Sequence, residues 1–167
     1  PLGNTLLQEK DSPKSAHVCI SHFHWDHIIG YLGFVPFFSK DFTCNIYGKQ
    51  DKLSIDEIFS HLHNYTFWPV EIPMYQAKFN LRTFPNDGVQ VSDSVKISAT
   101  LHGHPNGANS YRLEVGEKII VYCTDIEHPD DHLNPNVIEI ARDADVLIKD
   151  AQFTDEQLPV HKGWGHS

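Results

Sequence analysis

The sequence predicts an α/β domain in which β-strands alternate with helices. Residues 95–101 alternate apolar and polar side chains, as a half-buried strand does. Residues 110–115 and 118–123 have the pattern of a hairpin around the two-residue turn Gly116-Glu117. Residues 54–62 place apolar side chains at helical spacing and begin with a Ser-x-x-Glu capping pattern. Strands with interspersed helices are typical of an αβ sandwich.

The remaining elements follow from apolar runs and from the positions of proline. Three runs predict strands, of which the last is expected to be a further buried strand: 17–21, 42–47 and 145–149. A short helix is expected at residues 136–142. Pro69 and Pro73 make residues 66–80 an extended loop or an edge strand, because proline cannot donate to a central sheet ladder.

Length and composition indicate one soluble domain in a reducing compartment. The chain has 167 residues, of which 40% are hydrophobic and 21% charged, enough for a single core. No apolar stretch approaches the roughly 20 residues that cross a bilayer, and no signal peptide is visible, so no membrane contact is expected. We expect Cys19, Cys44 and Cys123 to be buried and reduced, which suits a cytoplasmic protein.

The acidic charge balance bears on the class of substrate. The formal net charge is −9, whereas nucleic-acid binders usually carry a basic stripe that neutralises phosphates. The nearest approach to such a stripe is Lys10 to Lys14, which Asp11 and Pro13 interrupt. A small-molecule substrate is therefore expected rather than a long nucleic acid.

A dense group of metal-ligand residue types follows the first predicted strand. His22-x-His24-x-Asp26-His27 places three imidazoles and a carboxylate within six residues. If residues 22–24 are extended, His22 and His24 point to the same side and can reach one ion. Where the chain then turns, Asp26 and His27 are aimed elsewhere, which suits a second ion. Zinc accepts these ligands, and imidazole with carboxylate also suits iron or manganese.

This motif and three later segments resemble the metallo-β-lactamase superfamily, in particular its ribonuclease Z-like and small-molecule phosphodiesterase branch. The string from Ser21 to His27 is similar to the family signature. The later similar segments, in chain order, are Leu101-His102-Gly103-His104-Pro105, Tyr122-Cys123-Thr124-Asp125 and Gly163-Trp164-Gly165-His166-Ser167. The resemblance implies an αββα metallo-β-lactamase-like sandwich.

The resemblance also implies a set of metal ligands. In it, one ion is held by three histidines, a second by an aspartate and a histidine, and one aspartate bridges the two ions. These residues are His22, His24 and His104 for the first ion, Asp26 and His27 for the second, and Asp125 as the bridge. Two alternatives stay open, because His102 competes with His104 and because Asp125 could instead cap a helix or a turn.

Two divalent metal ions, zinc with manganese or iron as alternatives, are the cofactors that the resemblance implies. Such a pair lowers the pKa of a bridging water and polarises the oxygen under attack. Asp26 could orient that water or take a proton from it. His166 is similar to a family histidine that lies near the substrate and aids the leaving group, so we interpret it as a catalytic residue.

These features predict a metal-dependent hydrolase that cleaves a small phosphodiester, with a cyclic nucleotide as the leading hypothesis. A carboxyl-ester or lactone hydrolase with the same metals is the enzymatic alternative. The non-enzymatic alternative is a catalytically incomplete metal-binding module.

The extent of the resemblance predicts an incomplete domain. It covers residues 17–167, which we expect to form the domain core, and leaves residues 1–16 as a partial N-terminal segment. Family members carry further strands before the signature and a further metal histidine later in the chain, so we expect truncation at both ends. Lost strands expose sheet edges, and a homo-oligomer paired through such edges is therefore expected.

Overall fold

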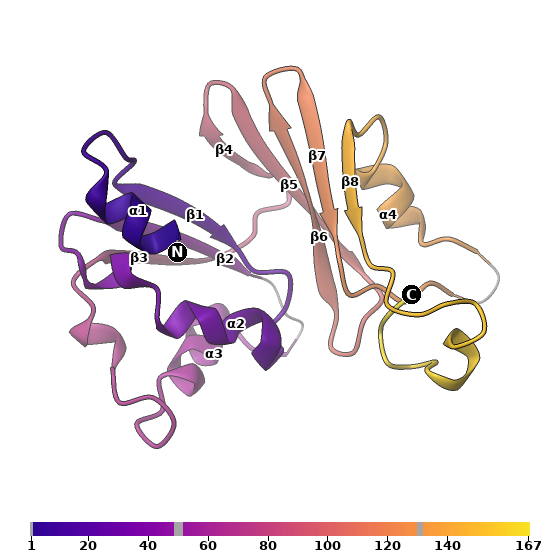
Figure 1. The fold of residues 1–167 in the computed structure, drawn as a ribbon, viewed down its shortest axis with the longest axis horizontal. Coiled ribbons are helices and arrows are strands. Elements are labelled where there is room, and N and C mark those ends of the chain that lie inside the picture. The colour runs from indigo at the N-terminus through magenta and orange to yellow at the C-terminus, as the bar shows by residue number, and fades with distance from the viewer. Residues whose placement is uncertain (1, 49–51, 130–131) are drawn as a thin grey trace. The chain divides into compact units, whose positions relative to one another are not determined.

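The computed structural model describes residues 2–48, 52–129 and 132–167 (Figure 1). The described residues form two compact units, one made of residues 2–48 and 52–83 and the other of residues 84–129 and 132–167. Each unit has its own sheet, with three strands in the first and five in the second among the described residues.

The first unit is built on a parallel sheet of order β1-β2-β3. Parallel neighbours need a crossover connection, and helices supply it here. The strands are β1 (Ser15–Cys19), β2 (Thr43–Gly48) and β3 (Lys78–Thr83), and the crossover helices are α2 (Trp25–Leu32) and α3 (Ile55–Leu62). Before β1 comes α1 (Leu2–Gln8), and short 3-10 turns occupy Val35–Phe38 and Ile72–Met74.

Helix α3 confirms the predicted helix and its capping box. The Ser54 hydroxyl accepts from the Glu57 backbone N–H at 3.3 Å, and the Glu57 carboxylate accepts from the Ser54 N–H at 2.8 Å. The apolar stripe of α3 is buried in a core that includes Phe37, Phe42 and Ile46. Local polar bonding and apolar burial therefore agree on the same helix.

The second unit is built on a mixed sheet of order β4-β5-β6-β7-β8. Its first four strands are antiparallel neighbours, and β8 pairs parallel to β7. The elements are β4 (Val89–Ser92), β5 (Val95–His102), β6 (Ala108–Val115), β7 (Lys118–Cys123), α4 (Pro135–Ile140), β8 (Val146–Lys149) and a 3-10 turn at Leu158–Val160. A small core of Val121, Cys123, Ile126, Val137 and Ile140 lies between the sheet and α4.

The strand directions of this sheet bring three strand ends to one edge. Strands β5 and β7 are both antiparallel to β6, and β8 is parallel to β7, so β5, β7 and β8 run the same way. The segments that follow His102, Cys123 and Lys149 therefore leave from the same edge of the sheet (Figure 1). The candidate site residues in these three segments therefore lie at the same edge of the sheet.

The predicted hairpin is confirmed, whereas the prediction of a buried strand at 145–149 is wrong. Val115 pairs with Lys118 across the Gly116-Glu117 turn, where Gly116 adopts a φ of 58°. Among the described strands, β8 pairs with β7 alone, and Val146, Leu147 and Ile148 are 49%, 47% and 46% exposed. An apolar run looks the same in a central strand and in an edge strand, so the sequence pattern cannot separate them.

The three cysteines are free thiols, as predicted, although Cys19 is only partly buried. Burial raises the pKa of Cys19 to about 11 and that of Cys44 to about 12. Burial also raises the pKa of Cys123. Because the thiolate is the reactive form, these groups behave as small apolar side chains near neutral pH. None of the described helices is both long enough and apolar enough to cross a bilayer.

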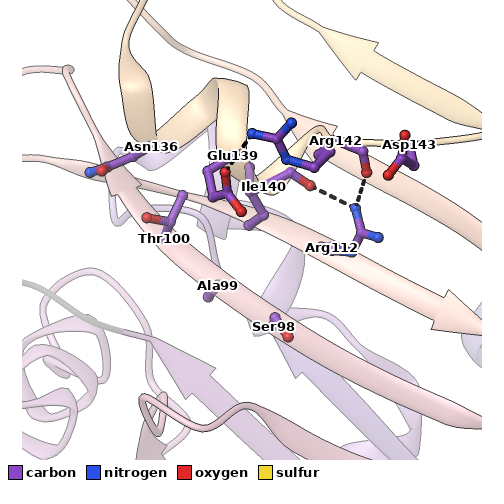
Figure 2. Close-up of a pocket in the computed structure, with 9 residues that line it drawn as sticks. All are labelled: Ser98, Ala99, Thr100, Arg112, Asn136, Glu139, Ile140, Arg142 and Asp143. Atoms are coloured by element: carbon purple, nitrogen blue, oxygen red, sulfur yellow. Dashed lines mark hydrogen bonds and ion pairs between the residues drawn. The ribbon is translucent and has the colours of Figure 1, made fainter.

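A charged pocket of about 410 Å³ lies between α4 and strands β5 and β6 (Figure 2). The Arg112 guanidinium links β6 to the end of α4 by donating to the carbonyl oxygens of Ile140 at 3.0 Å and Arg142 at 2.6 Å. Arg112 also pairs with Glu114 at 3.1 Å. It thus satisfies the Ile140 carbonyl, which helix geometry leaves without a partner at the C-terminal end of α4, and the Arg142 carbonyl just beyond the helix.

Replacing Arg112 tests this anchoring role. Arg112→Met keeps the length of the aliphatic stem but removes the donors, so we expect a loss of about 2 kcal/mol in the free energy of unfolding. Arg142→Met is the matched control, because its ion pair with Glu139 is exposed and should change stability by less than about 0.5 kcal/mol. Urea unfolding followed by circular dichroism measures both. Equal free energies of unfolding for the two variants would show that the hydrogen bonds from Arg112 to the end of α4 do not stabilise the fold.

Candidate metal centre

The first group of candidate ligands lies in the segment that joins β1 to α2. His24 is the N-cap of α2 and is extended, with φ −68° and ψ 150°. Helix α2 then begins at Trp25, so Asp26 and His27 lie in its first turn. The predicted change from extended chain to a turn therefore occurs within the motif, and the turn is helical.

The imidazoles of this segment converge. The ring centroids of His22 and His24 are 4.5 Å apart, and those of His22 and His27 are 4.1 Å apart. His22 is only 3% exposed, whereas the Asp26 side chain is 78% exposed and lies 3.3 Å from His27 Nε2. The negative side chain in the first turn of α2 also complements the helix dipole. His22 and His24 thus lie together as expected, and the His27 ring lies close to that of His22 as well.

The second group gathers at the shared edge of the five-stranded sheet. His104 follows β5, Asp125 follows β7, and His166 belongs to the loop after β8. One potential ligand atom from each of these residues lies within 4.8 Å of the others. The topology of the sheet explains how residues far apart in sequence meet here.

The hydrogen bonds of His102 and His104 distinguish their roles. His102 Nε2 donates to the Asp125 carbonyl at 3.1 Å, and Nδ1 accepts from the Ser110 hydroxyl at 2.8 Å. Both nitrogens are engaged by the protein, and burial lowers the pKa of this imidazole. His104 Nδ1 donates to the Gly165 carbonyl at 2.8 Å, so Nε2 carries the lone pair. His104 is therefore the candidate ligand, and His102 is structural.

Asp125 adopts a left-handed backbone conformation with φ 56°. This conformation costs a non-glycine residue on the order of 1–3 kcal/mol, and aspartate tolerates it better than most residues. The bond from His102 to the Asp125 carbonyl holds it in place. Among the described elements the next helix, α4, begins only at Pro135, so Asp125 is not a helix cap.

Asp150 is a site residue that the sequence interpretation missed. Its carboxylate accepts from His166 Nδ1 at 2.8 Å and from the Ile126 and Gln152 backbone N–H groups, each at 3.1 Å. The Asp150 side chain is only 5% exposed, so these hydrogen bonds, rather than water, compensate for the burial of the carboxylate. A signal was present, because Asp150 follows β8 directly, much as Asp125 follows β7.

The residues of the second unit fit a divalent ion. With Nδ1 of His104 and His166 both donating to oxygen acceptors, each Nε2 is the nitrogen with a lone pair. A carboxylate and such imidazoles are the donor set that zinc prefers and that iron and manganese accept. A pocket of about 570 Å³ borders His104, and its lining includes Gly103, Pro105, Glu127, His128 and Gly163.

The sequence matches the model of one protein family over nearly its whole length. The model of the beta-lactamase superfamily domain matches residues 3–167. The chain belongs to the metallo-β-lactamase superfamily. This membership confirms the predicted fold, an α/β arrangement with two sheets that is partial relative to its relatives.

Among curated members of the superfamily, ribonuclease Z of Thermoplasma acidophilum is 26% identical over 197 aligned positions. The alignment covers 90% of this chain but only 61% of that protein. The chain therefore spans about three fifths of the length of this relative, as the expectation of an incomplete domain implied.

Two solved structures share the fold. The metallo-beta-lactamase fold protein YhfI of Bacillus subtilis has a TM-score of 0.64 at 24% identity, with 90% of this chain and 54% of that chain covered. The short form of human tRNase Z has a TM-score of 0.67 at 15% identity, with 98% and 69% covered. At these identities the likeness concerns the fold.

His102→Ala tests the structural role of this histidine. The substitution leaves the Ser110 hydroxyl and the Asp125 carbonyl without their partner in a buried place, so we expect a loss of about 2–4 kcal/mol in the free energy of unfolding at pH 8. His61→Ala, at the exposed end of α3, is the control and should cost less than about 0.5 kcal/mol.

Wild type and His102→Ala should also differ in how their free energy of unfolding depends on pH. Because the folded pKa of His102 lies below its ordinary value of 6.5, the unfolded chain binds more protons in the window just below that value. The stability that His102 contributes is present above 6.5 and falls as pH drops through the folded pKa. The stability gap between wild type and His102→Ala should therefore narrow below about pH 6.5. A constant gap would contradict a buried neutral imidazole.

Proposed function

We propose that the protein is a metal-dependent hydrolase that cleaves a small phosphodiester, with a cyclic nucleotide as the favoured substrate class. The observation that carries the proposal is the convergence of His104, Asp125 and His166, with the Asp150 carboxylate bound to His166. The likeness to a ribonuclease Z supports a phosphodiester, because RNA is a phosphodiester polymer.

Charge and size favour a small diester within this class. The net charge of −9 opposes a long nucleic acid, for which phosphate neutralisation supplies most of the affinity. The pocket of about 570 Å³ beside His104 is in the range of small-molecule sites. A lactone or a carboxyl ester would also fit such a pocket, and substrate assays distinguish these classes.

We propose further that the ligand set that the motifs predict holds two divalent ions, with zinc as the first choice of metal. The set is the one that the motifs predict: His22, His24, Asp26, His27, His104 and Asp125. Two such ions would polarise the phosphate oxygens and lower the pKa of a shared water toward neutrality. Asp26, exposed at the start of α2, would orient that water.

His166 supplies the proton to the leaving oxygen in this proposal. Its Nδ1–H is donated to Asp150, so Nε2 is the nitrogen that gives up a proton and takes one back. The Asp150 carboxylate holds the ring in one orientation and stabilises the imidazolium that general-acid catalysis needs. The bonds from Ile126 and Gln152 keep that carboxylate in place.

Asp125→Asn tests the metal centre. The amide keeps the shape of the side chain and tolerates the left-handed φ, but it lacks the negative charge that a bridging ligand supplies. We expect close to two ions per chain in wild-type full-length protein and one or none in the variant, measured by elemental analysis after purification without chelator. Asp143→Asn is matched, since Asp143 also has a φ of 55° but is exposed. Equal metal content in all three proteins would contradict the assignment.

His166→Asn separates a proton donor from a metal ligand. We expect a 10²–10⁴-fold loss of kcat with a cyclic nucleotide and less than about tenfold with bis(p-nitrophenyl) phosphate, whose leaving group needs no proton. Metal content should stay at the wild-type value. His161→Asn, in the same loop and stacked on Phe153, is the control. Loss of metal would assign His166 as a ligand instead, and turnover of lactones or esters without any diester cleavage would sink the phosphodiester proposal.

A further inference from the structure

The Glu127 carboxylate is bound by two backbone N–H groups of a distant loop. It accepts from Gly163 N at 2.8 and 3.0 Å, one distance to each oxygen, and from Gly165 N at 2.8 Å. Both glycines have left-handed φ values, 85° and 88°, which turn their N–H groups toward one carboxylate. Hydrogen bonds to an ionised acceptor are the strong kind, so this contact fixes the path of the loop.

The loop that Glu127 holds lies directly against His104. The Gly165 carbonyl accepts from His104 Nδ1 at 2.8 Å, and His166 is the next residue. A side chain at residue 165 would not fit, because a Cβ there would lie 2.2 Å from His104 Nδ1. The position of Gly165 therefore sets both the protonated nitrogen of His104 and the starting point of His166.

The backbone of Glu127 adds a third connection. Its N–H donates to the Gly103 carbonyl at 3.1 Å, in the segment immediately before His104. Glu127 itself lies two residues after Asp125. One residue thus ties together the three segments that carry His104, Asp125 and His166.

We propose that Glu127 is a positioning residue of the metal centre, which fixes the tautomer and orientation of His104 and the location of His166 through Gly165. This inference rests on the proposed function, because it assigns Glu127 a role at that same site. Both carboxylate oxygens accept from backbone N–H groups, so Glu127 orients ligands and does not coordinate the ion itself.

The test compares Glu127→Ala and Glu127→Gln in the full-length protein, with Glu117→Gln as the control for loss of one charge. Glu117 lies in the exposed turn between β6 and β7. In metal-free protein at pH 8, histidine side-chain ¹H–¹⁵N NMR should show His104 as the Nδ1–H tautomer in wild type. Glu127→Ala should lose this single tautomer, and Glu127→Gln should keep part of it because its carbonyl oxygen can still accept.

Metal affinity gives the second readout. In competition with a chromophoric chelator, Glu127→Ala should bind Zn²⁺ about 10–100-fold more weakly than wild type, Glu127→Gln should lie between them, and Glu117→Gln should match wild type. The absorption spectrum of the Co²⁺ form should shift with Glu127→Ala, which a loss of stability alone would not cause. Should Glu127→Ala fail to fold, Glu127→Gln carries both readouts.

The outcomes separate this inference from the proposed function. Unchanged His104 tautomer, Zn²⁺ affinity and Co²⁺ spectrum in a folded Glu127 variant would overturn the positioning role while leaving the proposed hydrolase intact. Changed tautomer and affinity in a protein that cleaves no phosphodiester would support the positioning role and overturn the proposed substrate class.

Discussion

The arrangement of the second donor set depends on the His102 imidazole, which joins the end of β5 to the end of β7. One ring nitrogen accepts from Ser110 on β6, and the other donates to the Asp125 carbonyl. Three strands are therefore connected through a single buried side chain at the edge where the candidate ligands emerge. Burial keeps this imidazole neutral by lowering its pKa, and neutrality is what allows one nitrogen to accept while the other donates.

Unusual backbone conformations collect at the same edge. Asp125, Gly163 and Gly165 all have positive φ values, and each lies next to a hydrogen bond that restrains it. A positive φ strains Asp125 but not the two glycines, and a strained residue persists only where its surroundings determine its conformation. Here the surroundings are the His102 imidazole for Asp125 and the Glu127 carboxylate for the two glycines. These hydrogen bonds hold side chains that come from separate segments of the chain.

The sequence was informative where local chemistry decides the structure. The capping box of Ser54 and Glu57, the hairpin at Gly116 and the His22–His27 motif all depend on neighbours a few residues apart. The fold class followed from these local patterns and from the resemblance that the motifs carry. The motif predicts a turn after His24, and in the structure that turn is the start of helix α2 at Trp25.

Features that depend on contacts between distant residues could not be predicted from the local sequence pattern. Whether β8 is central or at an edge depends on which strands lie beside it, which an apolar run does not encode. Asp150 and Glu127 were missed as site residues because their partners are 16 and 36–38 residues away. The backbone N–H groups that a carboxylate binds cannot be identified from the sequence, because every residue except proline offers the same donor.

The choice between His102 and His104 shows how the roles of chemically identical side chains are set. The two residues are separated by one position, and both imidazoles donate to a backbone carbonyl. His102 donates from Nε2 and also accepts at Nδ1, so the protein uses its whole ring. His104 donates from Nδ1, which puts the lone pair on Nε2, and His166 does the same with Asp150 as its acceptor. The acceptors around each ring, rather than the histidine itself, therefore decide which imidazoles support the chain and which can serve a metal ion or a substrate.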